Sequence, residues 1–224
     1  MSDETGARVR NEIGWRDVLS RARGSNIQLG LRGFDAALDA INSEEAAVRA
    51  LDDGALTERA VALRGRVREG APRHAVRVEM YALAREAARR TLGQRPYDVQ
   101  VVAALALDRR AVVEMQTGEG KTLTATMPVA LNALDGLGVH VLTFNDYLAR
   151  RDAHWMGPVY RLLGLSVGFV QHEMEARQRR DAYAADVTLR DGQGGRFRPP
   201  ARPARGGSGG GGAPAVRLCP GGRG

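Results

Sequence analysis

Six residues, Thr117-Gly118-Glu119-Gly120-Lys121-Thr122, constrain the fold more than any other segment of this 224-residue chain. They follow a short apolar run, 111–115, that is typical of a buried parallel strand. They precede a segment, 121–135, with the pattern of a helix. Strand, glycine-rich loop and helix in this order form a phosphate-binding loop, in which backbone N–H groups and the helix N-terminus surround an anion. The sequence therefore predicts an α/β domain that binds a nucleotide.

Each residue type in this loop suits phosphate chemistry. Gly118 and Gly120 let the backbone approach phosphates closely, on either side of Glu119. Lys121, the only lysine in the chain, supplies a compact positive charge, and Thr122 supplies a hydroxyl for Mg²⁺. The alternative interpretation is a glycine-rich turn that contains Gly-Lys-Thr by chance.

The loop is of the short type. Longer phosphate-binding loops carry a glycine six positions before the lysine, and this chain has Met115 there. The pattern Thr-Gly-x-Gly-Lys-Thr is that of helicase-like motors. Pro128 lies inside the following helix and is expected to kink it rather than end it.

The chain divides into three parts by pattern. Residues 1–72 predict a helical N-terminal extension, with a helix over 57–70 that Thr57 could cap. Residues 73–188 begin with a helix over 73–92, whose apolar stripe is expected to face a core. Strands over 138–144, 166–170 and from 185 onward then alternate with helices over 145–163 and 173–183, which predicts a parallel sheet covered by helices on both faces. Residues 189–224, rich in Gly, Arg and Pro, predict a disordered tail.

Composition excludes several classes of protein. One cysteine, Cys219, rules out an internal disulfide framework and fits a reducing cytoplasm. No apolar stretch approaches the about 18 residues of a membrane span, and the N-terminus lacks the plan of a signal peptide. The four histidines are widely separated without metal-ligand spacing, so we expect surface or core-edge positions for His74, His140, His154 and His172.

The net charge of +7 is weaker evidence for a nucleic-acid partner than its size suggests, because of where the charges lie. Residues 189–224 contain seven arginines and a single acidic residue, Asp191, so nearly all of the excess positive charge belongs to the tail. The predicted nucleotide-binding part is close to neutral. We therefore expect no nucleic-acid partner.

Four separate blocks of the sequence resemble the first nucleotide-binding domain of the SecA preprotein translocase ATPase. They are residues 95–100, with Arg95-Pro96-Tyr97 and Gln100; 114–126, around the loop; 139–152; and 182–188. The resemblance covers about residues 73–188 closely and the preceding helices loosely. It implies a P-loop ATPase fold of the RecA type and a role in protein translocation.

The resemblance also implies roles for individual residues. Gln100 looks like the glutamine whose amide reads adenine, while Gly118, Glu119, Gly120, Lys121 and Thr122 would hold the ATP phosphates, with Mg²⁺ on the Thr122 hydroxyl. Arg95 and Tyr97 would shape the pocket, or else belong to a turn packed against the preceding helix. Asn145–Asp152 would couple the ATP state to other motor domains, or else form a plain capped surface helix.

The partners implied by the resemblance are unfolded preproteins and the membrane protein-conducting channel, with acidic lipids a further candidate. The implied location is cytoplasmic, peripheral at the inner face of the bacterial plasma membrane. The match stops before the carboxylate motif that holds Mg²⁺ and before the second motor domain, so no catalytic set is complete and weak ATP binding with little hydrolysis is expected. A fragment of a nucleic-acid helicase and a non-enzymatic adaptor are the alternatives.

The sequence departs from the family after Thr188. The family continues with a Tyr-Gly-Thr turn, whereas this chain reads Leu189-Arg190-Asp191. Synonymous codons exist for residues 189–202 that, with the first base removed, encode Tyr-Gly-Thr-Ala-Lys-Glu-Ala-Gly-Phe-Asp-Leu-Leu-Arg. This favours a one-base insertion near codon 188. A genuine disordered tail, or a basic tail that binds acidic lipid or nucleic acid, is the alternative.

Sequencing the genomic DNA across codons 180–210 and downstream tests the insertion. We expect that removing one base opens a long reading frame with the carboxylate motif and a second motor domain. A short frame that stands, with no continuation in any frame, would show that the basic tail is genuine.

Overall fold

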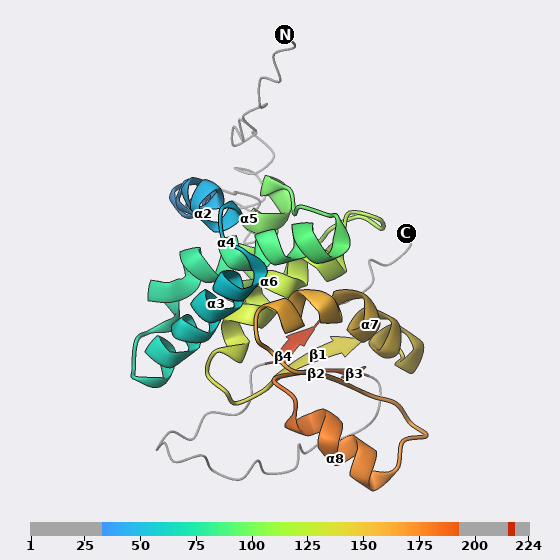
Figure 1. Ribbon diagram of the computed structural model, residues 1–224. Coiled ribbons are helices and arrows are strands. Elements are labelled where there is room, and N and C mark those ends of the chain that lie inside the picture. The colour runs from blue at the N-terminus through green and yellow to red at the C-terminus, as the bar shows by residue number, and fades with distance from the viewer. Residues whose placement is uncertain (1–32, 193–214, 218–224) are drawn as a thin grey trace.

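The computed structural model describes residues 33–192 and 215–217 (Figure 1). Seven helices are described: α2 (Asp35–Arg49), α3 (Asp53–Arg68), α4 (Arg73–Leu92), α5 (Asp98–Asp108), α6 (Lys121–Ala133), α7 (Asp146–Leu162) and α8 (Ala176–Ala184). Four strands accompany them: β1 (Val139–Thr143), β2 (Val167–Val170), β3 (Val187–Asp191) and β4 (Ala215–Arg217). The predicted start and end of α4 are both confirmed.

The strands form one parallel sheet in the order β2-β3-β1-β4. Val187 of β3 stands opposite Val139 of β1 on one side and Val167 of β2 on the other. Helix α7 packs on one side of this sheet and α8 on the other, α6 contacts both β1 and α7, and α2 to α5 complete the helical layer on the side of α7 (Figure 1). The predicted α/β class and the three strands after the loop are confirmed.

Helix α4 is the centre of the core. Ten of its residues are buried, and it packs against α2, α3, α6 and α7. The predicted stripe of Val76, Met80, Leu83 and Ala87 is indeed buried, but Tyr81 and other residues on the remaining faces are buried too. Burial on all sides is typical of a helix enclosed by other elements. Residues from α2 to β3 share one core, so the helices before residue 73 pack as part of the same unit.

Two charged side chains of α4 lie inside this core, Arg85 at 3% and Glu86 at 5% exposure. Buried charges are stable only when they are paired. Arg85 donates from Nε to the carbonyl of Pro96 (2.8 Å), and its other nitrogens reach Asn42 Oδ1 (2.6 Å) and Asp98 Oδ1 (2.5 Å). Burial lowers the pKa of Arg85, and the hydrogen bond to Asp98 opposes this shift. One guanidinium therefore joins α2, α4 and the start of α5.

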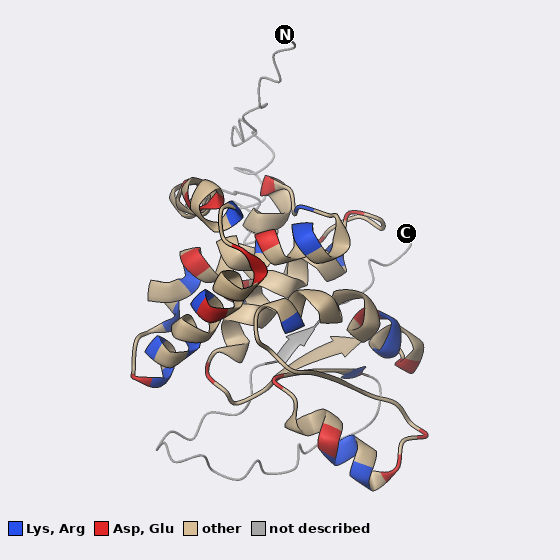
Figure 2. Ribbon diagram, viewed as in Figure 1, with Lys and Arg blue, Asp and Glu red and all other residues tan. Residues whose placement is uncertain are grey.

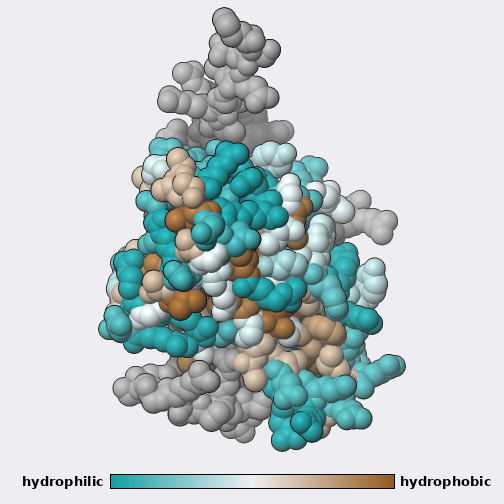
Figure 3. All heavy atoms as spheres, viewed as in Figure 1, coloured by the Kyte–Doolittle hydropathy of each residue, from teal (hydrophilic) through white to brown (hydrophobic). Residues whose placement is uncertain are grey.

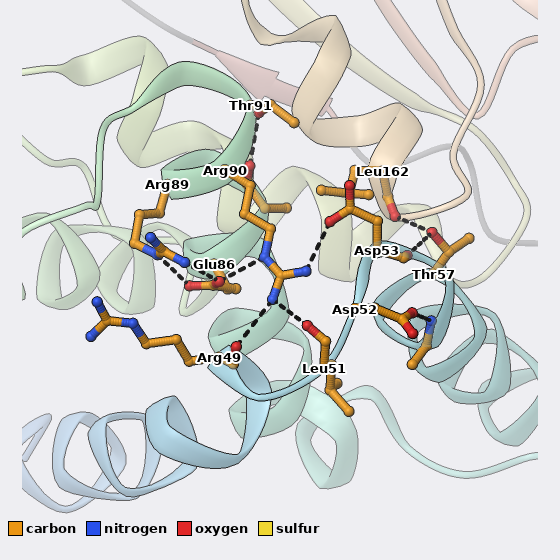
Figure 4. A network of polar contacts seen from close by, with 12 residues as sticks. Arg49, Leu51, Asp52, Asp53, Thr57, Glu86, Arg89, Arg90, Thr91 and Leu162 are labelled. Carbon is orange, nitrogen blue, oxygen red and sulfur yellow. Dashed lines mark hydrogen bonds and ion pairs between the residues drawn. The ribbon is translucent and has the colours of Figure 1, made fainter.

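Glu86 anchors a second network (Figure 4). Its Oε1 accepts hydrogen bonds from Arg89 and from Arg90, both at 2.7 Å. Arg90 also donates to the carbonyl of Leu51 (2.7 Å) and to Asp53 Oδ1 (2.8 Å). Burial raises the pKa of Glu86, but the hydrogen bonds from the two arginines outweigh it and the net shift is downward. Arg90 thus fixes the connection between α2 and α3.

The predicted strand at 111–115 is wrong. These residues form no regular element and pair with no described strand, and Val112 is fully exposed. The backbone N–H of Ala111 is used to close the end of α5, donating to the carbonyl of Ala106 (3.0 Å), with Arg110 in the left-handed region (φ 63°). Both edges of β1 are already occupied, by β3 and by β4. An apolar run becomes a strand only where a free edge can take its hydrogen bonds.

Two other predicted boundaries differ. Asp52, not Thr57, caps α3, and the Thr57 hydroxyl instead donates to the carbonyls of Asp53 and Leu162. The predicted disordered tail from residue 189 begins inside β3, which runs to Asp191, and β4 pairs with β1 within that tail. The rest of the tail lies outside the described residues. The expectation that Pro128 does not end its helix is confirmed, since α6 continues through it to Ala133.

The surface carries both signs of charge. Figure 2 shows acidic and basic residues interspersed along the helices in this view. In Figure 3 the same face is mostly hydrophilic, with hydrophobic residues visible near its middle. Among the described residues, no helix is both long and apolar enough to cross a membrane.

The helical layer is tied to the sheet by an ion pair at its amino-terminal edge. Arg64 of α3 lies 2.5 Å from Asp186 Oδ1, and the N–H and hydroxyl of Ser166 donate to Asp186 Oδ2 (3.0 and 2.8 Å). Burial alone would raise the pKa of Asp186, but the hydrogen bonds from Ser166 and the charge of Arg64 lower it. Asp186 therefore connects α3 to the segments just before β2 and β3.

Substituting Arg85→Ala tests the first network. The change leaves the Pro96 carbonyl and Asn42 without a buried donor, so we expect a loss of about 3 kcal/mol in the free energy of unfolding, measured by urea denaturation. Arg89→Ala, on the same helix, is the control and should change stability little because Arg90 still pairs with Glu86. Equal losses in both variants would contradict a special role for Arg85.

Asp186→Asn tests the pH dependence of stability. The folded pKa lies below the ordinary value of 3.8, so the carboxylate stabilises the fold above that pH, and this contribution is lost as the pH falls through the folded pKa. We expect the substitution to lower the free energy of unfolding by about 2 kcal/mol at neutral pH and by less near pH 3. A loss that is the same at both pH values would exclude the charge as its cause.

Candidate nucleotide-binding loop

The glycine-rich loop leads directly into α6. Gly118 and Gly120 both have positive φ, 93° and 78°, and Gly120 is the N-cap of the helix. Such backbone angles are open to glycine and strained for other residues. The two glycines therefore turn the chain so that the first residues of α6 present their N–H groups beyond the helix end.

Four backbone N–H groups in the loop and the first turn of α6 are available to a ligand. The amides of Gly118, Gly120, Lys121 and Thr122 have no hydrogen-bond partner among the residues that the structure describes. Free N–H groups and the positive end of the helix dipole attract an anion. The backbone at this position fits a phosphate group.

Two side-chain hydrogen bonds connect residues within the loop and its flanks. Lys121 Nζ donates to the carbonyl of Gln116 (2.8 Å), and Glu119 Oε2 accepts from the N–H of Gln116 (2.7 Å). Gln116 directly precedes the predicted loop, but no sequence pattern marks it as part of the site. A phosphate that bonded Lys121 would compete with the Gln116 carbonyl for the ammonium group.

Gln100 holds the loop against α5. Its Oε1 accepts from the N–H of Tyr97 (2.9 Å) and its Nε2 donates to the carbonyl of Glu119 (2.8 Å). The side chain is buried, and a Cβ on Gly120 would lie 2.5 Å from Gln100 Nε2. The backbone angle therefore requires glycine at 120, and a larger residue would also push the Gln100 amide aside. Both polar ends of the Gln100 amide are occupied by protein groups in this structure.

The start of α6 provides two threonine hydroxyls. Thr122 is half-buried and its hydroxyl makes no hydrogen bond to the described residues, so it is free to meet a cation held by phosphates. The hydroxyl of Thr124 is buried without a partner, one turn before Pro128. No described carboxylate other than Glu119 lies on the loop itself.

Arg95 and Tyr97 do not line a pocket at the loop. Arg95 forms a two-point ion pair with Glu45 of α2, at 2.7 and 2.6 Å, and the hydrogen bond from Arg95 lowers the pKa of Glu45. The ring of Tyr97 is 72% exposed. These contacts favour the alternative interpretation, a turn packed against a preceding helix, with α2 as that helix.

The segment 145–152 forms the N-cap and the first two turns of α7, as expected. The Asn145 side chain caps the helix by accepting from the N–H of Leu148 (2.9 Å). Ala149 and Asp152 face the core, and Tyr147 is 70% exposed. Burial raises the pKa of Asp152, and the hydrogen bonds from Arg151 offset part of this rise. One face of this helix is thus core, and the other is open to solvent.

Comparison with known proteins identifies the family. The model for the SecA DEAD-like domain matches residues 19–193. The chain is 50% identical over 171 residues to the protein translocase subunit SecA of Solidesulfovibrio magneticus, which covers 76% of this chain and 20% of that protein. It is 51% identical over 158 residues to SecA of Rubrobacter xylanophilus, which covers 70% of this chain and 18% of that protein. The chain thus spans about a fifth of the length of these relatives. With more than half of its residues matched by one family model, this chain belongs to the SecA family.

Proposed function

We propose that this chain is the ATP-binding part of a SecA-like motor that couples ATP to the movement of preproteins through a membrane channel. The single observation that carries the proposal is the set of four unpartnered N–H groups at the glycine-rich start of α6. The membership of the SecA family supports the choice of ATP and of translocation over other P-loop chemistries.

The phosphates of ATP would bind at Gly118, Glu119, Gly120, Lys121 and Thr122. The backbone amides would bind phosphate oxygens, and Lys121 would exchange its bond to the Gln116 carbonyl for one to a phosphate. Mg²⁺, when bound, neutralises phosphate charge, and the Thr122 hydroxyl would be its protein ligand.

Adenine recognition by Gln100 would require one of its present bonds to change. Release of the Tyr97 N–H would free Oε1, and release of the Glu119 carbonyl would free Nε2. The second exchange also loosens the loop, because the Glu119 carbonyl directly precedes Gly120. Base and phosphate binding would then be coupled through one side chain.

The partners proposed for the motor are unfolded preproteins and the protein-conducting channel, with acidic lipids at the membrane surface. The named relatives are translocase subunits, which supports this assignment. The exposed side of α7, with Tyr147 at 70% and Trp155 at 47% exposure, would couple the nucleotide state to neighbouring parts of the motor. The proposed location is peripheral, at the inner face of the plasma membrane.

We expect these 224 residues to hydrolyse ATP very little. Hydrolysis by such motors needs a carboxylate pair that holds Mg²⁺ and orients water, and the sequence contains no match to that motif. Most of the catalysis in phosphoryl transfer is positioning and electrostatic stabilisation. Binding without turnover is therefore the expected property of the chain.

Thermal unfolding with and without MgATP tests the loop. If ATP binds only the native state, a concentration about 100 times its Kd should stabilise the chain by roughly 2.7 kcal/mol. Lys121→Ala should abolish most of this shift, because the amides alone retain no full positive charge at the phosphates.

Arg177→Ala is the matched control, since it removes an exposed cation on α8 away from the loop. Its shift with MgATP should equal that of the unmodified chain. A shift retained in Lys121→Ala, or no shift in the unmodified chain, would refute the phosphate-loop assignment.

A further inference from the structure

Three side chains from three different connections meet at the carboxyl edge of the sheet. Asp146 begins α7 just after β1, His172 follows β2, and Asp191 is the last residue of β3. One nitrogen or oxygen from each side chain lies within 4.8 Å of the other two. Because β3 stands between β2 and β1, the three segments are neighbours in space although they are far apart in sequence.

The backbone of His172 is held in place on both sides. Its N–H donates to Asp146 Oδ2 (2.6 Å), and its carbonyl accepts from Arg179 of α8. Arg179 also donates to the carbonyl of Met174 (3.1 Å), which fixes the same turn. The imidazole is therefore presented by a tethered loop, although the side chain itself is 69% exposed.

The other two side chains stand on regular elements. Asp146 occupies the first turn of α7, and its Oδ1 has no partner among the described residues. Asp191 is paired in register with Thr143, and the following N–H, of Gly192, donates to the Thr143 carbonyl (2.9 Å). Rigid backbones place ligands more accurately than loops do.

The separation between His172 and Asp191 matches that of two ligands of one metal ion. His172 Nε2 lies 3.4 Å from Asp191 Oδ2, a distance that is also that of a long ion pair when the imidazole is protonated. Two ligands at about 2.1 Å from a tetrahedral metal ion are about 3.4 Å apart, so this spacing equals one edge of such a coordination sphere.

We propose that Asp146, His172 and Asp191 bind one divalent transition-metal ion of the zinc type. One imidazole and two carboxylates are ligands that Zn²⁺ accepts, and they leave a fourth position for water or another ligand. The imidazole disfavours Mg²⁺ and Ca²⁺, which prefer oxygen ligands alone. The two aspartates carry two negative charges, which the ion balances.

The site shares no residue with the glycine-rich loop, and its test does not depend on the proposed function. Asp191 lies after Thr188, where the sequence departs from the family. The site is thus a property of this chain and need not recur in its relatives.

Titration of the full chain with ZnCl₂ by isothermal calorimetry tests the proposal, in a Cys219→Ser background because a thiol is a strong zinc ligand. We expect saturable binding of one ion per chain. His172→Ala and Asp191→Asn should each weaken it by about tenfold or more. His74→Ala, which removes another exposed imidazole, is the matched control and should leave binding unchanged.

NMR of the histidine side chains gives a direct readout that does not need a variant to fold. The imidazole resonances of His172 should shift when Zn²⁺ is added, and those of His74, His140 and His154 should not. No saturable heat, tighter binding of MgCl₂ than of ZnCl₂, or zinc affinity unchanged in the His172→Ala, Asp191→Asn double variant would overturn the proposal. Shifts confined to other histidines would overturn it as well.

Discussion

The burial of two adjacent charges on α4 constrains the rest of the structure. Arg85 and Glu86 lie in the most enclosed helix, where an unpaired charge would destabilise the fold by several kcal/mol. Their partners come from α2, from the α2–α3 connection through Arg90, and from the turn before α5. These segments can pair the charges only when they occupy their native positions. The ion pairs and hydrogen bonds that stabilise these two buried charges therefore also fix the arrangement of the helical layer.

This constraint extends to the proposed nucleotide-binding loop. Asp98, which pairs with Arg85, is the first residue of α5, and Gln100, two residues later in that helix, donates to the carbonyl of Glu119. A continuous path of hydrogen bonds and one short helix thus runs from the buried guanidinium to the loop. Because none of the described residues before the loop forms a strand, α5 and α6 support the loop instead. The geometry of the loop depends on helix packing.

Local pattern predicted the elements whose partners are also local. The three strands after the loop, the full length of α4 and the Asn145 cap were all readable from periodicity and capping chemistry. The strand at 111–115 was not, because its formation depends on a free sheet edge, and β1 has none. The sequence left Arg95 open between a base pocket and a turn packed on a helix, and its partner, Glu45, lies in a helix far away in sequence. The cluster around His172 had no sequence signal, since sheet order alone brings its three residues together.

The state of the loop bears on how tightly a nucleotide can bind. Lys121 and Glu119 are both bonded to Gln116, and Gln100 is bonded at both ends, so the loop is closed by its own groups. A phosphate that draws Lys121 away from Gln116 exchanges one bond, and an adenine that uses Gln100 must displace another. Each exchange subtracts from the binding free energy, because the bonds lost offset those gained. The four free N–H groups are the part of the site that needs no rearrangement. Phosphate binding is therefore expected to precede, and to permit, recognition of the base.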